Sequence, residues 1–238
     1  MKNSTLTGLI CTFLVCAFST ADATIIADYA SGFSTSSNPT GDWQYGYVTA
    51  LGNTPTLSTR LTSYGAGNEV TAWSPAGTFW PTIGLNTSAS AVSFGAGNAI
   101  TLAPGQGLLH PGQFGEYADV RLTIPLSFTG TLNVQFQGVD AVGTTTDVHV
   151  LDNGTSLFSA LIGSYGQIQS FSITKSFLSG EVLDFAVGPG ANGNFTDDST
   201  GFTATLSDTL APVPLPASAW LLLSGLCGVG ILNRKRRA

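Results

Sequence analysis

Aromatic side chains in the first half of this 238-residue chain are its best-suited groups for recognising a ligand. An aromatic face can stack on the apolar C–H surface of a sugar ring, so such a group could bind a neutral glycan. Trp80 lies in a Phe-Trp-Pro turn, which favours exposure, whereas Trp43 and Trp73 are more readily accommodated in a core. The candidate carbohydrate-binding residues are Trp43, Tyr45, Trp73 and Trp80.

A glycine-containing loop near residue 195 concentrates side-chain oxygen atoms. Hard cations such as Ca²⁺ prefer carboxylate and amide oxygens, so this loop is a candidate calcium site. Its candidate ligands are Asn192, Asn194, Asp197 and Asp198. A solvated turn is the alternative, and added calcium should raise the melting temperature only if the site is real.

Catalytic groups are few. His110 and His149 are the only histidines, and His149 shares one side of a predicted strand with Asp147. That pair could act in acid–base chemistry or bind a metal, but we expect a hydrogen-bonded strand surface. Glycoside hydrolysis needs two carboxylates at a separation set by the fold, and the chain offers several: Asp140, Asp147, Asp184 and Asp197. No nucleophile triad, metalloprotease or phosphate-loop motif is present, so we expect no enzymatic activity.

Charge and cysteine content limit the possible partners. Residues 24–212 contain 13 acidic and 3 basic side chains, a formal net charge of −10. Such a domain repels nucleic acid and anionic lipid, but it tolerates calcium and neutral glycans. The three cysteines lie outside this segment, at Cys11, Cys16 and Cys227, so the segment has neither disulfides nor thiol chemistry.

The elements that must position these groups are predicted to be β-strands. Gly, Ser and Thr are abundant, and no long run shows helical periodicity. Alternation is clearest at residues 117–124, 130–139 and 183–187, and Asp152-Asn153-Gly154 predicts a tight hairpin turn. With further short strands near residues 24–29, 43–50, 56–61, 70–73, 91–94, 99–102 and 201–206, we predict an all-β, jelly-roll-like two-sheet sandwich over residues 24–207, without a helix.

A short sequence echo lies inside the predicted sandwich. Residues 63–70 and 93–100 share a Gly-Ala-Gly-Asn core, displaced by 30 residues. Two isolated copies cannot build a stacked repeat array, because each repeat needs neighbours to bury its apolar face. We therefore predict two similar strand-to-strand turns rather than calcium-binding repeats.

The N-terminal segment has the pattern of a secretory signal peptide. Lys2 precedes an apolar stretch over residues 6–18, and the segment ends in Ala21-Asp22-Ala23. A charged start, a short apolar core and a small-x-small ending are recognised by export machinery. We expect residues 1–23 to form an apolar signal helix that is removed by cleavage after Ala23.

The C-terminal segment has three parts in a fixed order. A Pro-rich linker at residues 208–216 leads into an uncharged stretch at 217–232, followed by a basic tail at 233–238. The stretch is about 24 Å long as a helix, a marginal transmembrane span, and the basic cluster favours the cytoplasmic side. The defining residues are Val213, Pro214, Leu215, Pro216, Ala217, Arg234, Lys235, Arg236 and Arg237.

This C-terminal pattern resembles a PEP-CTERM sorting signal, in the subtype with Leu in place of Glu. The resemblance implies recognition by an exosortase in a Gram-negative bacterium that makes exopolysaccharide. The expected course is export, a precursor anchored in the inner membrane, and delivery to the cell-envelope surface or an extracellular matrix such as a biofilm. The resemblance covers only residues 213–238.

The later half of the predicted sandwich also carries a resemblance. Leu109-His110-Pro111-Gly112, residues 145–150 and residues 183–190 look like segments of secreted bacterial β-sandwiches, which are similar to galactose-binding-like domains and carbohydrate-binding modules. The resemblance implies a non-enzymatic protein that binds or organises polysaccharide. The alternatives are a secreted glycan hydrolase with a carboxylate pair and a self-associating matrix protein.

Overall fold

The computed structural model describes residues 23–209. The predicted signal peptide up to Asp22 and the predicted sorting motif, transmembrane helix and basic tail lie outside the described residues. No helix between residues 23 and 209 has the length and apolar character needed to span a membrane.

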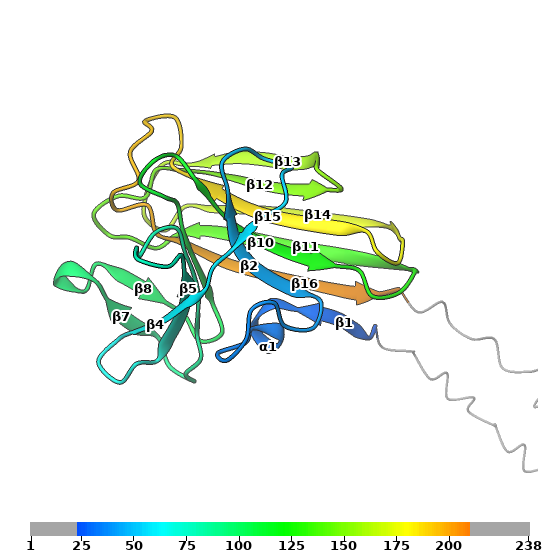
Figure 1. The fold of residues 1–238 in the computed structure, drawn as a ribbon, viewed down its shortest axis with the longest axis horizontal. Coiled ribbons are helices and arrows are strands. Elements are labelled where there is room, and N and C mark those ends of the chain that lie inside the picture. The colour runs from blue at the N-terminus through cyan, green and yellow to red at the C-terminus, as the bar shows by residue number, and fades with distance from the viewer. Residues whose placement is uncertain (1–22, 210–238) are drawn as a thin grey trace, which may run out of the picture. The chain divides into compact units, whose positions relative to one another are not determined.

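Two antiparallel sheets form the body of this part of the chain (Figure 1). The eight-stranded sheet has the order β14 (Ile168–Phe177), β11 (Phe128–Gly138), β16 (Thr200–Asp208), β9 (Gly107–His110), β6 (Thr82–Asn86), β5 (Val70–Ser74), β4 (Arg60–Tyr64), with β1 (Ile25–Asp28) also paired to β16. The six-stranded sheet has the order β13 (Thr155–Ile162), β12 (Thr146–Asp152), β15 (Val182–Gly188), β10 (Tyr117–Thr123), β2 (Trp43–Val48), β3 (Thr56–Leu57). The predicted all-β two-sheet sandwich is confirmed.

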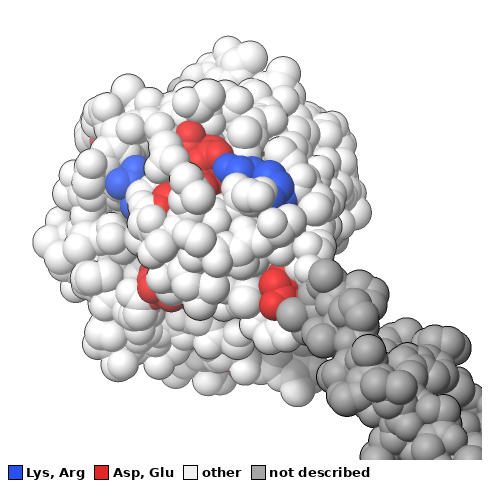
Figure 2. Space-filling view, turned by 90° about the vertical axis from the view of Figure 1, so that its right-hand side faces the viewer, with Lys and Arg blue, Asp and Glu red and all other residues white. Residues whose placement is uncertain are grey.

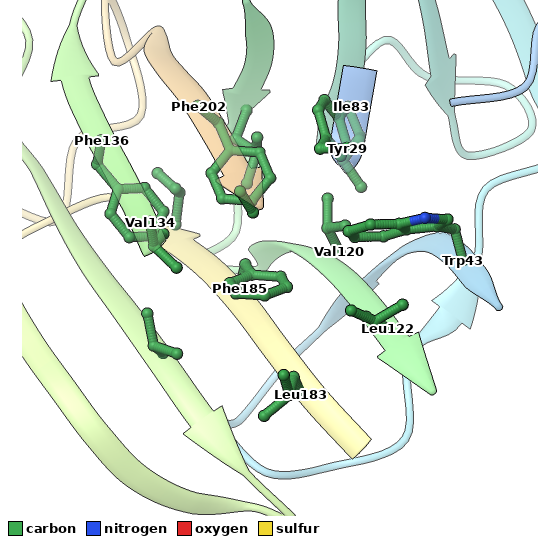
Figure 3. Packing of buried hydrophobic residues seen from close by; sticks show 14 of the residues in the cluster. Tyr29, Trp43, Ile83, Val120, Leu122, Val134, Phe136, Leu183, Phe185 and Phe202 are labelled. Carbon is green, nitrogen blue, oxygen red and sulfur yellow. The ribbon is translucent and has the colours of Figure 1, made fainter. Parts of the chain in front are cut away.

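The main core lies between the two sheets, and strand periodicity explains which residues reach it. On β11, Leu132, Val134 and Phe136 point inward, as their alternation predicts. Phe202 of β16 lies 5.4 Å from Phe136 and 5.3 Å from Phe185 of β15, measured between ring centroids. Figure 3 shows Phe185 facing these rings from the opposite sheet. These aromatic contacts join the two sheets.

A second apolar cluster lies on the outer face of the eight-stranded sheet. Leu109 belongs to the main core, so its neighbour Leu108 must point outward. There Leu108 joins residues of a small hairpin, β7 (Val92–Phe94) and β8 (Ile100–Leu102), and Val139 beyond β11. The hairpin therefore covers part of the outer face.

Turn chemistry follows the sequence closely. Asn153 and Gly154 both have positive φ, 47° and 78°, which matches the two-residue turn predicted between β12 and β13. The echo at residues 63–70 and 93–100 forms two turns of similar geometry, with Asn68 and Asn98 at φ 62° and 57°. The second turn contains η1 (Ala96–Asn98). The prediction of two similar turns is confirmed.

Three local predictions were wrong. A single helical turn, α1 (Tyr29–Gly32), follows β1, because the Asp28 carboxylate caps it by accepting the Ser31 N–H at 2.8 Å. Strands β6 and β9 were not anticipated, because Gly84 interrupts the apolar pattern of β6 and β9 is only four residues long. A Cβ at Gly84 would collide with Ala72 of the neighbouring strand, so close packing explains this glycine.

Charged side chains are sparse on the surface. Charged residues make up 9% of the chain, and Figure 2 shows them as separate islands on an otherwise uncharged face. A cluster of like charges is therefore a distinctive feature wherever one occurs.

Candidate functional site

A cavity of about 360 Å³ lies on the outer face of the eight-stranded sheet. Its floor is formed by Thr82 of β6 together with Leu108 and His110 of β9. Thr82 and His110 are directly paired across these strands, and both point away from the main core because Ile83 and Leu109 point into it. The floor is thus set by strand register.

Four further segments form the walls of this cavity. The turn before β6 contributes Phe79 and Trp80, and the β7–β8 hairpin contributes apolar residues from Phe94 to Ile100. The loop after β11 adds Asp140 and Val142, and the loop after β15 adds Phe195, Thr196, Asp197 and Ser199. Segments far apart in the sequence therefore meet at one site.

Three rings pack around one side of the cavity. Trp80 lies 5.5 Å from Phe195 with an interplanar angle of 67°, and 5.9 Å from the His110 ring. His110 and Phe195 complete the triangle at 6.1 Å. The Trp80 side chain is 37% exposed, so part of the indole face remains open to a ligand. This open face is a stacking surface.

His110 offers the cavity a hydrogen-bond acceptor. Its Nδ1 lies 2.9 Å from the Pro111 carbonyl oxygen, which can only accept, so Nδ1 carries the proton and Nε2 is the unprotonated nitrogen. Burial lowers the pKa of His110 to about 4, although the Pro111 hydrogen bond and the charge of Asp197 act in the opposite direction. The ring is therefore neutral at pH 7.

Two carboxylates, Asp140 and Asp197, also line the cavity. Asp140 is 4% exposed, and its Oδ1 accepts the Val142 N–H at 3.0 Å. Burial, with Asp197 contributing, raises the pKa of Asp140 above its ordinary value. Burial also raises the pKa of neighbouring Asp198 to about 6; hydrogen bonds from Thr145 oppose this shift, and the charges of Asp197 and Asp140 add to it. Asp140 and Asp197 line the cavity, and their charges repel that of Asp198, which does not line it.

Within residues 23–209, no ion pair compensates these three carboxylates. Arg121 pairs with Asp184, and Lys175 pairs with Asp152 and Glu181. Arg60 lies 4.1 Å above the Phe79 ring and donates to the Thr78 carbonyl. Arg121 and Lys175 are therefore engaged elsewhere, while Arg60 contacts a ring of the cavity wall without pairing with these carboxylates.

The structure excludes three of the four candidate sugar-stacking residues, and for Trp43 and Trp73 it confirms the core position that the sequence favoured. Trp43, Tyr45 and Trp73 are 5%, 0% and 6% exposed and belong to the main core. Trp73 Nε1 donates to the Ser34 carbonyl at 2.8 Å, and the Tyr45 hydroxyl donates to the Gly32 carbonyl at 3.1 Å. Their positions on β2 and β5 turn these rings toward the opposite sheet. Trp80 alone of the four lines the cavity.

The predicted calcium ligands are largely engaged by the protein itself. The Asn192 and Asn194 side-chain oxygens each accept a backbone N–H within their own loop, and Asp198 Oδ1 accepts two hydrogen bonds from Thr145. Among the four, only Asp197 lines the cavity. Within the described part of the chain, no group of three or more His, Cys, Asp or Glu side chains could hold a metal ion.

The candidate catalytic carboxylates separate into two kinds. Asp147 accepts from His149 at 2.8 Å on β12, so the interpretation of this pair as a hydrogen-bonded strand surface is confirmed. Although burial raises the Asp147 pKa, hydrogen bonds from His149 and the Gly190 N–H hold it below its ordinary value. Asp184 is bound by Arg121. Only Asp140 and Asp197 reach the same cavity.

Sequence reasoning missed Phe195 altogether, and it did not anticipate that His110 ends β9 and faces the cavity. Phe195 is the lone aromatic residue in a polar, glycine-containing loop, and that contrast is a usable signal. The contact between Phe195 and Trp80 joins residues 115 positions apart, which no local pattern indicates.

No protein-family model matches this chain, and no curated protein sequence matches it. Solved structures with a similar fold include carbohydrate-binding modules. One holds CBM51-2 in complex with GlcNAc and INT domains from Clostridium perfringens, with 11% identity and a TM-score of 0.35 over 63% of this chain; this chain spans 40% of that structure. Another is a variant of CBM29-2, with 13% identity and a TM-score of 0.33 over 81% of this chain and 100% of that one. A family 35 module from Clostridium thermocellum has 10% identity and a TM-score of 0.31 over 62% and 98% of the two chains. Scores this low carry no argument about a ligand.

Proposed function

We propose that the described domain is a non-enzymatic saccharide-binding module whose ligand occupies the cavity beside Trp80. The observation that supports this proposal is that aromatic rings and hydrogen-bond acceptors line one cavity. The rings are those of Trp80 and Phe195, and the acceptors belong to His110, Asp140 and Asp197. A sugar ring has the matching surfaces, an apolar C–H face and a rim of hydroxyl donors.

The size of the cavity suits a small ligand. Its volume of about 360 Å³ lies at the lower end of the range for small-molecule sites. Such a volume accommodates one or two sugar rings, so the cavity would receive the end or a branch of a longer glycan. Binding the polymer in this way would let the protein attach to or organise polysaccharide.

A glycan-array screen followed by calorimetry tests the proposal. The purified full chain would be kept in a detergent without a sugar headgroup, because residues 217–232 are apolar. Phe195→Ala and Trp80→Ala should each weaken binding by about 0.5–1.5 kcal/mol, or roughly 2- to 13-fold. Phe114→Ala is the matched control, since Phe114 is 83% exposed and does not line the cavity. Binding that survives both cavity variants would contradict the proposed site.

Glycan hydrolysis is the second candidate function, favoured by the presence of Asp140 and Asp197 in one cavity. Release of reducing ends from any bound glycan would support it. Asp140→Asn should then abolish turnover while binding persists, whereas a binding module shows no turnover at all. Concentration-dependent assembly without glycan, measured by light scattering, would instead favour a self-associating matrix protein.

We also propose that the C-terminal segment directs export and sorting by an exosortase. The support is the ordered sequence of Pro214-Leu215-Pro216, the apolar residues 217–232 and the basic cluster 234–237. The chain would pass through an inner-membrane precursor to the envelope surface or extracellular matrix. Replacing Pro214 and Pro216 with alanine should leave the precursor in the membrane fraction, while replacing Pro212 should not. Equal distribution of both variants would contradict the motif's role.

A further inference from the structure

The charged and imidazole groups that line the cavity accept hydrogen bonds or carry negative charge, beside the hydroxyls of Tyr64, Thr196 and Ser199, which can also donate. His110 presents Nε2 as an acceptor, and Asp140 and Asp197 present carboxylate oxygens. The Thr82 hydroxyl donates to the Phe79 carbonyl, so its proton is already engaged. The charge that the lining carries is negative, so a positively charged ligand would fit it better than a neutral one.

The negative charge of the site is unbalanced within the described domain. Asp140 and Asp197 make no ion pair among residues 23–209, and Asp198, on which both charges act, has a buried Oδ2 without a hydrogen-bond partner. When a ligand displaces water from the cavity, uncompensated carboxylates lose solvation. A neutral sugar cannot replace that solvation by charge, whereas a cation can.

The aromatic side of the cavity suits the same cation. Trp80 and Phe195 lie 5.5 Å apart at 67°, so together they present an indole and a phenyl ring toward one space. Ring faces attract ammonium groups, and Trp does so most strongly. Arg60 makes such a cation–π contact with the Phe79 ring. Its guanidinium also donates a hydrogen bond to the Thr78 carbonyl, which holds it at that ring.

We propose that the ligand is an amino sugar, whose ring stacks on Trp80 and whose free ammonium group lies between these rings and the carboxylates of Asp140 and Asp197. This inference rests on the proposed saccharide-binding function and specifies the class of sugar. A hard metal ion fits less well, because it needs six or more oxygen ligands and the cavity is mostly apolar.

Two disaccharides with the same β-1,4 backbone test the inference: di-glucosamine and its di-N-acetyl form. Calorimetry at about pH 6.5 lies below the pKa of a sugar amine, which its neighbouring oxygens lower, and above the ordinary aspartate pKa of about 3.9, which leaves room for the raised pKa of Asp140. We expect the amine form to bind the full chain at least tenfold more tightly. A disaccharide avoids the multivalent attraction that a long polycation would have for an acidic protein.

The controls separate specific contacts from general attraction. Asp140→Asn and Asp197→Asn should each abolish the preference for the amine form, and Asn tolerates the positive φ of 63° at position 197. Asp42→Asn makes the same charge change at an exposed position outside the cavity and should retain the preference. Added salt should weaken the amine form more than the acetylated form.

Three results would overturn the inference, and they differ in what else they reject. Equal binding of both disaccharides, or tighter binding of the acetylated one, removes the amino-sugar assignment but leaves saccharide binding in place. If calcium competes with the disaccharide for the same carboxylates, the cation bound at this site is a metal ion and not an ammonium group. No binding to either disaccharide or to any glycan on the array rejects both the inference and the proposed function.

Discussion

Replacing Arg121 tests how the outer face of the six-stranded sheet is stabilised. Arg121 on β10 donates Nε and Nη2 to the two Asp184 oxygens at 2.6 and 2.9 Å, and Nη2 also reaches the Asn53 carbonyl at 3.0 Å. Asp119, two residues earlier on the same strand face, is 2% exposed and its Oδ1 has no hydrogen-bond partner. The Arg121 guanidinium therefore forms an ion pair with Asp184, and its positive charge also acts on the buried Asp119 carboxyl.

Arg121→Met keeps most of the side-chain length but removes the charge. Loss of one partner of a buried ion pair costs about 3–5 kcal/mol, because the other charge stays buried and unpaired. The Arg121 side chain is 12% exposed, which places the expected loss near the lower end, about 3 kcal/mol. For a domain of this size, that loss lowers the melting temperature by roughly 6–12 °C.

The pH dependence has a definite sign. Burial, with Asp184 contributing, raises the pKa of Asp119 well above its ordinary 3.8, and Arg121 opposes this shift. Folding therefore takes up a proton between 3.8 and the raised value, and stability falls as the pH rises through that window. Removal of Arg121 raises the Asp119 pKa further, so the loss should be larger at pH 7 than at pH 4.

Urea unfolding at both pH values measures the effect, with Arg60→Met as the matched control. Arg60 contacts the Phe79 ring near the surface, and its replacement should cost about 0.5–1 kcal/mol. A loss at Arg121 no larger than that at Arg60, or one that is the same at pH 4 and pH 7, would refute the assigned role.

Other predictions concern the core, the cavity wall and one close contact. Phe202→Ala should lower the free energy of unfolding by about 3–5 kcal/mol, because the ring is fully buried. The exposed Phe114 is the control, and Phe114→Ala should change that free energy by at most about 0.5 kcal/mol. Urea unfolding of both variants measures the difference. The pKa of Asp198 is raised to about 6, so the folded state loses stability as the pH rises from about 4 to 6. Asp198→Asn should flatten that part of a profile of unfolding free energy against pH. An unchanged slope would contradict this prediction. Gly138→Ala should destabilise by about 1–3 kcal/mol, because its Cβ would collide with the Ser164 carbonyl oxygen; an unchanged thermal midpoint would show that the segment can move aside.

The fold class could be predicted from the sequence because strand periodicity is local. Leu132, Val134 and Phe136 alternate along β11, and that period of two residues already indicates which face is buried. Asn153-Gly154 likewise specifies a turn through the backbone preferences of two adjacent residues. The exposure of Trp80 was predictable from its neighbours for the same reason.

Which aromatic residues face a ligand was decided only by the tertiary structure. Trp43 and Trp73 are on strands whose inward side depends on the sheet packed against them, and no local pattern states which side that is. Asp140 and Asp197 are 57 positions apart, and they meet because β11 and β16 pair in one register and the loops beyond them converge. The sequence by itself thus determined most of the strands, though not β6 and β9, together with the tight turns and the acidic character of the domain. The cavity forms only through long-range strand pairing. This pairing brings together residues that are distant in the chain, and no local sequence pattern predicts that they meet.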